Sequence, residues 1–137
     1  MKDFLTIILG TDAASYTLAR NIYDTYGQKS VVCGSGILIP FYHSCIAEMR
    51  IDENFSKEPD VFVRVLNQVH ADYKDQYRKF MILVQGEYYL RILYDNIHRL
   101  SFESVLPYPQ KELVQKYGIK SNFYERMKEI GVPVPQT

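Results

Sequence analysis

Two short segments of the sequence carry residue types that could bind a small substrate. The first contains the small or polar residues Gly10, Thr11, Asp12, Ala13 and Ser15. They follow the apolar run Phe4–Leu9, and a helix that starts here would offer free N–H groups to an anion. We expect backbone N–H groups of residues 10–13 to receive a carboxylate. A tight turn that caps a helix explains the same residues equally well.

The second segment follows the strongest apolar run of the chain, Phe80–Val84, and contains Gly86, Glu87 and Tyr88. A glycine followed by an acid at the end of a strand can position an amine or an ammonium group. We therefore expect these three residues to bind substrate. An ordinary helix start is the alternative, because Glu87 is favourable at the positive end of a helix dipole.

Other catalytic and metal-binding patterns are weak in this sequence. The three histidines lie far apart without the spacing of metal ligands, and His43 close to Cys45 is poor evidence for a thiol nucleophile with its base. Asp12 and Ser15 stand where a G-x-G-x-x-G motif would have its second and third glycines, which disfavours a nicotinamide cofactor. We predict no catalytic residue and no metal ligand in this chain.

Composition excludes several classes of function. The 137 residues include 16 Lys+Arg and 16 Asp+Glu, so the formal net charge is zero and we expect no nucleic-acid partner. No apolar run reaches the roughly 20 residues that a membrane-spanning helix needs, and the N-terminus lacks a secretion signal. The two cysteines, Cys33 and Cys45, form no C-x-x-C pattern. We expect reduced thiols in a cytoplasmic protein.

Strand and helix patterns alternate along the first part of the chain, which indicates βαβ crossovers with helices on both faces of a parallel sheet. We predict an α/β, Rossmann-like three-layer domain with a short parallel sheet of four or five strands. The predicted strands are Phe4–Leu9, Lys29–Cys33, Ile46–Ile51, Phe80–Val84 and Ser101–Leu106. The predicted helices are Ala14–Tyr26, Pro59–Tyr77 and Glu87–Arg99.

The last part of the chain has a different pattern. Pro107 and Pro109 break the alternation, a short helix is predicted over Glu112–Tyr117, and Ser121 or Asn122 would cap another. We therefore divide the chain into a Rossmann-like domain, residues 1–106, and a helical linker, residues 107–137.

This tail is similar to a junction found in ATP-grasp enzymes. Lys120–Glu125 and Ile130–Thr137 resemble the K-x-x-F helix and the G-(V/I)-P-x-P-x-T exit that precede the nucleotide-binding part of those enzymes. The prolines stiffen an extended exit from the last helix. We expect this junction to end the N-terminal domain of such an enzyme.

The front of the chain supports the same resemblance. Leu9–Asp12, the pattern Tyr16-x-x-Ala19-Arg20 and the pair Tyr26-Gly27 are similar to the opening of carboxylate–amine ligases of this superfamily. Within it, the D-aspartate ligases have the most similar pattern, including the strand–glycine–acid stretch at Gly86. The resemblance spans nearly the whole chain.

The resemblance implies a reaction and a set of partners. Carboxylate–amine ligases transfer the γ-phosphate of ATP to a carboxylate, Mg²⁺ neutralises the phosphate charge, and an amine attacks the acyl phosphate. ATP and Mg²⁺ are held mainly by two later domains, which are absent from these 137 residues, so we expect this piece alone to bind no cofactor and to be inactive. The implied partners are small carboxylate and amine substrates, such as cell-wall precursors, and the missing domains. A homodimer is compatible with the sequence. The sequence does not identify which carboxylate and which amine the enzyme joins.

Two other functions stay open from the residues alone. A non-catalytic α/β module could use the same crevice, or a tyrosine-rich face, to bind a small ligand or a protein. A dinucleotide enzyme is a weaker alternative, because the glycines are missing. A reading frame that continues for about 200–300 residues, roughly two domains, would favour the ligase.

Overall fold

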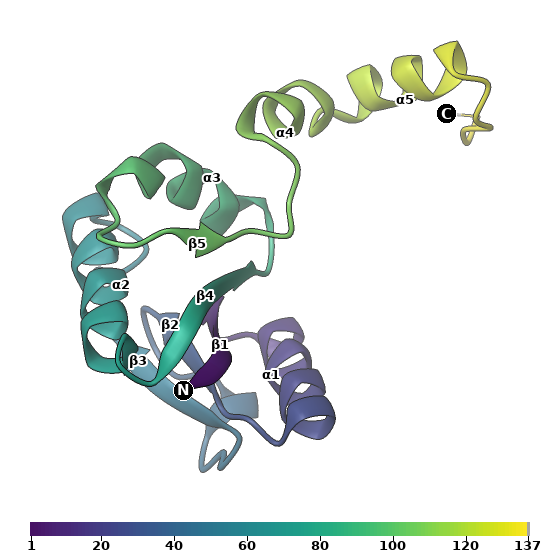
Figure 1. Cartoon of the computed structure of the whole chain (residues 1–137). Coiled ribbons are helices and arrows are strands. Elements are labelled where there is room, and N and C mark those ends of the chain that lie inside the picture. The colour runs from purple at the N-terminus through teal and green to yellow at the C-terminus, as the bar shows by residue number, and fades with distance from the viewer. Residues whose placement is uncertain (137) are drawn as a thin grey trace. The chain divides into compact units, whose positions relative to one another are not determined.

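One parallel sheet forms the centre of the structure (Figure 1). The computed structural model describes residues 1–136. Within them, five strands are arranged in the order β3-β2-β1-β4-β5, and all neighbouring strands are parallel. The strands are β1 (Lys2–Leu9), β2 (Ser30–Gly34), β3 (Ala47–Ile51), β4 (Tyr77–Val84) and β5 (Ser104–Val105). The predicted fold class is therefore confirmed.

Helices cover both faces of this sheet, with α1 on one face and α2 and α3 on the other (Figure 1). The helices are α1 (Ala13–Tyr26), α2 (Pro59–Tyr73), α3 (Glu87–Asn96), α4 (Lys111–Tyr117) and α5 (Lys120–Glu129). Two short 3₁₀ helices are η1 (Ile39–Phe41) and η2 (Ile97–Arg99). The sheet and its flanking helices make the predicted three layers.

The central strand β1 explains why its sequence is a continuous apolar run. Ile7, Ile8 and Leu9 have no solvent exposure, because the strand is covered on both faces. On the α1 side, Ile8 packs with Ala19, Val32, Phe41 and Ile46. On the other side, α2 contributes its buried face to the core: Phe62, Val63, Val65, Leu66 and Val69.

Local residue types explain both ends of α1. The carboxylate of Asp12 accepts a hydrogen bond from the N–H of Ser15, which caps the first turn. Gly27 adopts φ +62°, and its N–H donates to the carbonyl of Tyr23. Glycine fits this left-handed position without steric cost, so the helix ends there.

The predicted extent of α2 is wrong at its C-terminal end. The helix ends at Tyr73, and Tyr77 opens β4 instead of continuing the helix. The spacing of Tyr73 and Tyr77 fits a helix, but Lys2 at the start of β1 pairs with Tyr77, which draws that residue into the sheet. The last strand, β5, covers only Ser104–Val105 of the predicted 101–106.

The predicted cap of α5 is also wrong. The N-cap residue is Ile119, without a side-chain hydrogen bond, and Ser121 and Asn122 lie inside the first turn. The amide of Asn122 instead donates to the carbonyl of Lys116 at the end of α4. Asn122 therefore caps the preceding helix, which side-chain type alone does not reveal.

The chain divides into two compact units, Met1–Pro107 and a second that begins at Tyr108. We call residues 1–107 the sheet unit and residues 108–136 the helical unit. Thr137, the last residue of the ATP-grasp-like tail pattern, lies outside the described residues. The domain boundary after residue 106 remains a prediction.

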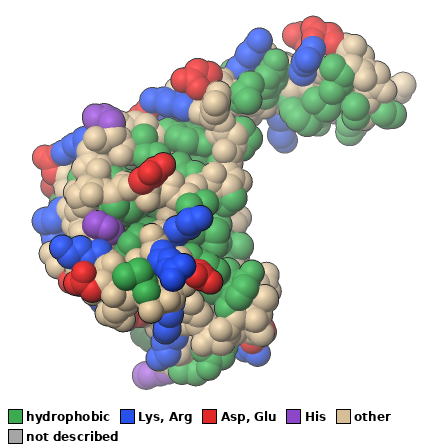
Figure 2. Space-filling model, in the orientation of Figure 1, with side chains coloured by type: hydrophobic (Ala, Val, Ile, Leu, Met, Phe, Trp, Pro, Cys, Tyr) green, Lys and Arg blue, Asp and Glu red, His purple; other side chains and the backbone are tan. Residues whose placement is uncertain are grey.

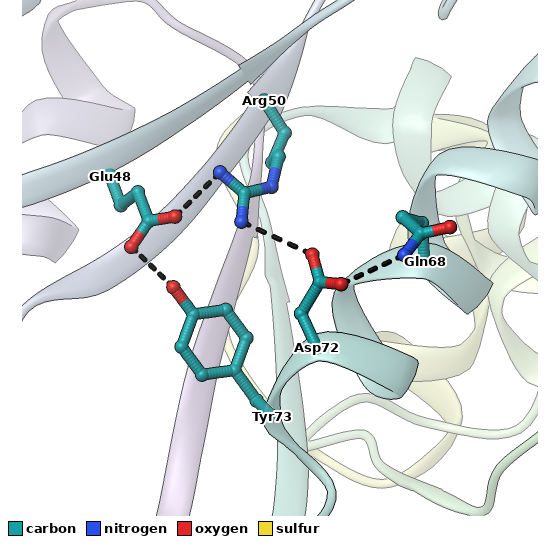
Figure 3. A network of polar contacts seen from close by, with 5 residues as sticks. All are labelled: Glu48, Arg50, Gln68, Asp72 and Tyr73. Atoms are coloured by element: carbon teal, nitrogen blue, oxygen red, sulfur yellow. Dashed lines mark hydrogen bonds and ion pairs between the residues drawn. The ribbon is translucent and has the colours of Figure 1, made fainter.

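A polar network ties the edge strand β3 to α2 (Figure 3). The guanidinium of Arg50 lies 2.5 Å from Glu48 and 3.3 Å from Asp72, and Gln68 donates to Asp72. The hydroxyl of Tyr73 donates to Glu48. Burial, followed by this hydrogen bond, raises the pKa of Tyr73 to about 12. The network holds the C-terminal half of α2 against the sheet.

Candidate substrate site at the carboxyl edge of the sheet

The carboxyl ends of the parallel strands bring the predicted site residues to one edge. Leu9 pairs with Cys33 on one side and with Val84 on the other, so β1, β2 and β4 end at the same level. The strand order reverses at β1, whose two neighbours, β2 and β4, are reached by crossovers on opposite faces of the sheet. Ligands of open α/β sheets bind outside the carboxyl ends at such a point.

Gly10 makes the turn out of β1 and leaves little room around it. Its φ of +113° disfavours residues with a side chain. A Cβ at this position would lie 2.9 Å from Oγ of Ser15 and 3.5 Å from Cε2 of Tyr89. The N–H of Gly10 donates to the carbonyl of Cys33, 2.9 Å away. Gly10 therefore provides close packing, while its own N–H is already used.

The start of α1 has one donor occupied and others that lack a partner within the helix. The N–H of Ser15 is bound by Asp12, whereas the N–H groups of Ala13 and Ala14 have no intrahelical acceptor, as in every first turn. The hydroxyl of Ser15 is buried and has no hydrogen-bond partner among residues 1–136. Thr11 packs against the end of β2, because a Cβ on Gly34 would lie 2.7 Å from its Cγ2.

The second predicted segment forms the start of α3. Gly86 is the N-cap residue with φ +88°. Glu87 is exposed and lies 3.6 Å from Arg91, one turn further along the helix. The side chain of Tyr88 is 55% exposed, and its hydroxyl donates to the carbonyl of Ser56. This segment thus contacts the loop after β3.

Sequence reasoning missed the residue that connects the two segments, Tyr89. Its ring lies beside Gly10, and it also packs against Phe55, with ring centroids 5.9 Å apart. Burial raises the pKa of the Tyr89 phenol, and a hydrogen bond with Ser35 opposes this shift. The adjacent tyrosines at 88 and 89 were a weak signal, because aromatic residues at a helix start are common packing residues.

A pair of serine hydroxyls also lies at this edge without a sequence signal. Oγ of Ser35, after β2, is 2.8 Å from Oγ of Ser56, in the loop after β3. The N–H of Ser56 donates to Oγ of Ser35. The two residues lie 21 positions apart, and only the fold brings them together. With Tyr88 and Tyr89 they form a polar cluster that joins the loops after β2, β3 and β4.

The loop after β3 is fixed by charged and backbone contacts. The N–H of Asn54 and the guanidinium of Arg64, at 2.7 Å, hold the pKa of Asp52 below its usual range. The N–H of Asp52 donates to the carbonyl of Gly34. These contacts place Ser56 at the hydroxyl cluster. The edge as a whole offers N–H groups, hydroxyls and the carboxylates of Asp12 and Glu87, which can bind and orient a small polar molecule.

Cys33 lies at this edge, where its carbonyl accepts the N–H of Gly10. Both cysteines are free; Cys45 is exposed, and burial raises the pKa of the Cys33 thiol to about 12. Among residues 1–136, no three His, Cys, Asp or Glu side chains gather in a way that could hold a metal ion. None of the helices within that range is long and apolar enough to cross a membrane.

The comparison with known proteins supports the sequence resemblance. No family model matches the chain. The D-aspartate ligase of Enterococcus faecium (strain Aus0004) is 27% identical over 136 residues, which is 99% of this chain and 32% of that protein. The chain thus spans about a third of the length of the curated relative that it matches. Along nearly its whole length, the chain is similar to part of a D-aspartate ligase, and the predicted resemblance is confirmed.

Proposed function

We propose that this chain is the N-terminal, substrate-side domain of an ATP-dependent carboxylate–amine ligase. The observation that carries the proposal is the 27% identity to D-aspartate ligase over 136 residues. The parallel sheet adds support, because open α/β domains bind ligands outside the strand ends at the point where the strand order reverses.

The proposed site binds a small molecule that carries a carboxylate and an ammonium group. The N–H groups of Thr11, Asp12 and Ala13 receive the carboxylate, whereas the N–H of Gly10 takes no part because it already binds the carbonyl of Cys33. The carboxylate of Asp12 caps α1 and offsets part of the positive charge at the start of the helix. We therefore expect weak binding by this domain alone.

At the other segment, Glu87 orients the ammonium group, with Gly86 and Tyr88 shaping the approach to it. Glu87 is available for this role because its ion pair with Arg91 is long, 3.6 Å, and exposed on both sides. Exposed pairs of this kind contribute little free energy, so a substrate ammonium group can replace the arginine at small cost.

The proposal assigns ATP and Mg²⁺ to further domains of the ligase, as the resemblance implies. The bound nucleotide supplies the phosphate that activates the carboxylate for attack by the amine. The residues of this chain hold the substrate at the carboxyl edge and orient it. Cell-wall precursors are the proposed substrates of the whole enzyme.

A calorimetric titration with D-aspartate tests this proposal. We expect saturable binding in the millimolar range, weakened about tenfold by Glu87→Gln, which corresponds to roughly 1.4 kcal/mol. Glu112→Gln, in the helical unit, is the matched control and should leave the affinity unchanged. Absence of binding, or equal affinity in Glu87→Gln and the parent chain, would contradict the proposed site.

A further inference from the structure

A cavity lies on the sheet unit, at the amino end of β4 and beside β5. Its volume is about 570 Å³. The end of α2, the first residues of β4 and the segment before β5 line it. The candidate substrate site lies beyond the opposite, carboxyl ends of the strands. Small-molecule pockets commonly have volumes of about 300–1,000 Å³, so this cavity has room for a metabolite-sized ligand.

Packed rings give the cavity a firm wall. The ring of His70 stacks on Phe102, with centroids 4.7 Å apart and planes 15° apart. His70 also meets the ring of Phe80 edge-on at 4.9 Å, and Phe80 lies 5.4 Å from Phe102. Phe80 is buried and anchored in β4. The wall is thus held by α2, β4 and the segment before β5 together.

The charges that line the cavity are mainly positive. Lys74, Arg78 and Lys79 contribute three cations, against the single carboxylate of Glu103. Arg78 also lies 3.9 Å from Asp3, but both side chains are well exposed, which makes this pair weak. Figure 2 shows Lys and Arg side chains gathered on this face over the β4 region. The chain as a whole is neutral, so this local excess is a specific feature.

A buried hydroxyl of the lining lacks a partner. Oγ of Ser104, in β5, is shielded from solvent and makes no hydrogen bond with the described residues. Its residue pairs with Phe80 in the sheet, which fixes its position at the cavity. A buried polar atom without a partner lowers the stability of the folded state. A turn of the Ser104 side chain towards the cavity would let a ligand oxygen remove that cost.

We propose that this cavity binds the phosphate group of a small phosphomonoester. Lysine and arginine side chains supply charge-assisted hydrogen bonds to phosphate oxygens, and Arg78 adds a planar fork that matches them. The Ser104 hydroxyl, once turned towards the cavity, donates to another oxygen. The volume exceeds what one phosphate needs, so the organic part of the ligand occupies the remainder, against Phe102 and Tyr77.

His70 reports on the occupancy of the cavity. Burial, followed by the charge of Lys74, lowers its pKa. The other titratable groups of the cavity are Tyr77, Arg78 and Lys79 from β4 and Glu103 from the segment before β5. A bound phosphate adds negative charge beside this ring, so it raises the pKa of His70, and binding becomes tighter as the pH falls through that pKa.

Nuclear magnetic resonance titrations with inorganic phosphate and with phenyl phosphate test the proposal. We expect saturable shifts of the His70 ring and of amides at 77–80 and 101–105, together with a raised His70 pKa. Tighter binding of phenyl phosphate identifies a phosphomonoester as the ligand. Tighter binding of inorganic phosphate overturns that assignment. Shifts that do not saturate, or a His70 pKa that phosphate leaves unchanged, overturn the site.

Variants separate a built site from general attraction to positive charge. The double variant Arg78→Gln/Lys79→Gln should weaken phosphate binding at least about tenfold, and Ser104→Ala should weaken it less. The matched control, Lys29→Gln/Lys57→Gln, removes two exposed lysines elsewhere on the sheet unit. Equal loss of affinity in both double variants would overturn the proposal, because it would show attraction to net charge alone.

Discussion

The sheet unit and the helical unit differ in how far their apolar side chains are buried. In the sheet unit, large side chains such as Phe62 and Leu66 are completely removed from solvent. Within α4 and α5, no residue is buried, and Leu113 and Phe123 remain 48% and 43% exposed. Both units have periodic apolar residues, but only in the sheet unit are these residues buried in a core. Periodicity therefore predicts a helix without predicting what covers it.

The helical unit has an apolar hollow of about 500 Å³, formed by α4, α5 and Pro109. Its lining residues are Pro109, Leu113, Val114, Tyr117, Gly118, Phe123, Arg126 and Met127. An exposed apolar surface of this kind is typical of regions that pack against other protein. It fits the proposal that this unit leads to further ligase domains.

The strongest test of the contrast is a pair of phenylalanine truncations. Phe62→Ala removes a fully buried ring from α2 and should lower the free energy of unfolding by about 3–5 kcal/mol. Phe123→Ala removes a half-exposed ring from α5 and should change it by less than about 0.5 kcal/mol. Urea denaturation followed by circular dichroism measures both. Similar losses in the two variants would show that the helical unit shares the core.

Two glycines of the sheet unit allow a crowded position to be compared with an open one. Gly10→Ala combines a positive φ with a close approach to Ser15 and should cost about 2–3 kcal/mol. Gly86→Ala has a positive φ, in a region that residues with a side chain rarely adopt, but open space around it, so it should cost about 1–2 kcal/mol of backbone strain. Thermal unfolding of both variants tests this order. A larger loss in Gly86→Ala would contradict the packing described at Gly10.

Alkaline pH should weaken the sheet unit through Tyr73. Because folding raises the pKa of this phenol from 10.0 to about 12, its contribution is complete below pH 10 and is lost as the pH rises towards 12. The group is partly exposed, so the effect should be no more than about 1 kcal/mol. Tyr73→Phe should flatten the pH dependence of the unfolding free energy in this window. Ionisation of the Cys33 thiol also lowers the stability of the fold between pH 9 and 12. This effect is the same in the parent chain and in Tyr73→Phe.

The smallest effect is expected from removing the helical unit. Within residues 1–136, the buried hydrophobic residues lie between Leu5 and Leu93, so residues 1–107 should unfold cooperatively with a midpoint close to that of the parent chain. Denaturation of the shortened chain measures this directly. A broad transition, or a large fall in the midpoint, would assign part of the core to residues 108–136.

Much of the fold was predictable because local signals and burial agree. The apolar run Phe4–Leu9, the cap at Asp12 and the stop at Gly27 each act over a few residues. The errors occurred where distant residues decide. Tyr77 has helical spacing, yet Lys2 pairs with it across 75 positions, and Asn122 caps a helix that precedes it.

The candidate site was predictable only in part. Strand ends bounded by glycine marked Gly10 and Gly86 as positions at the carboxyl edge of the sheet, where the fold places both. The connection through Tyr89, and the hydroxyl pair of Ser35 and Ser56, depend on loop conformations that no local pattern encodes. The use of the Gly10 N–H by Cys33 likewise follows from the strand register.

Mapping of ligand binding by ¹⁵N–¹H correlation spectra tests the central claim most directly. D-Aspartate added to the 137-residue chain should shift the amide signals of residues 11–15 and 86–89 in a saturable way. L-Aspartate, added as a control, should produce smaller shifts at the same concentration. Unchanged spectra, or shifts confined to other parts of the chain, would contradict a substrate site at the carboxyl edge of the sheet.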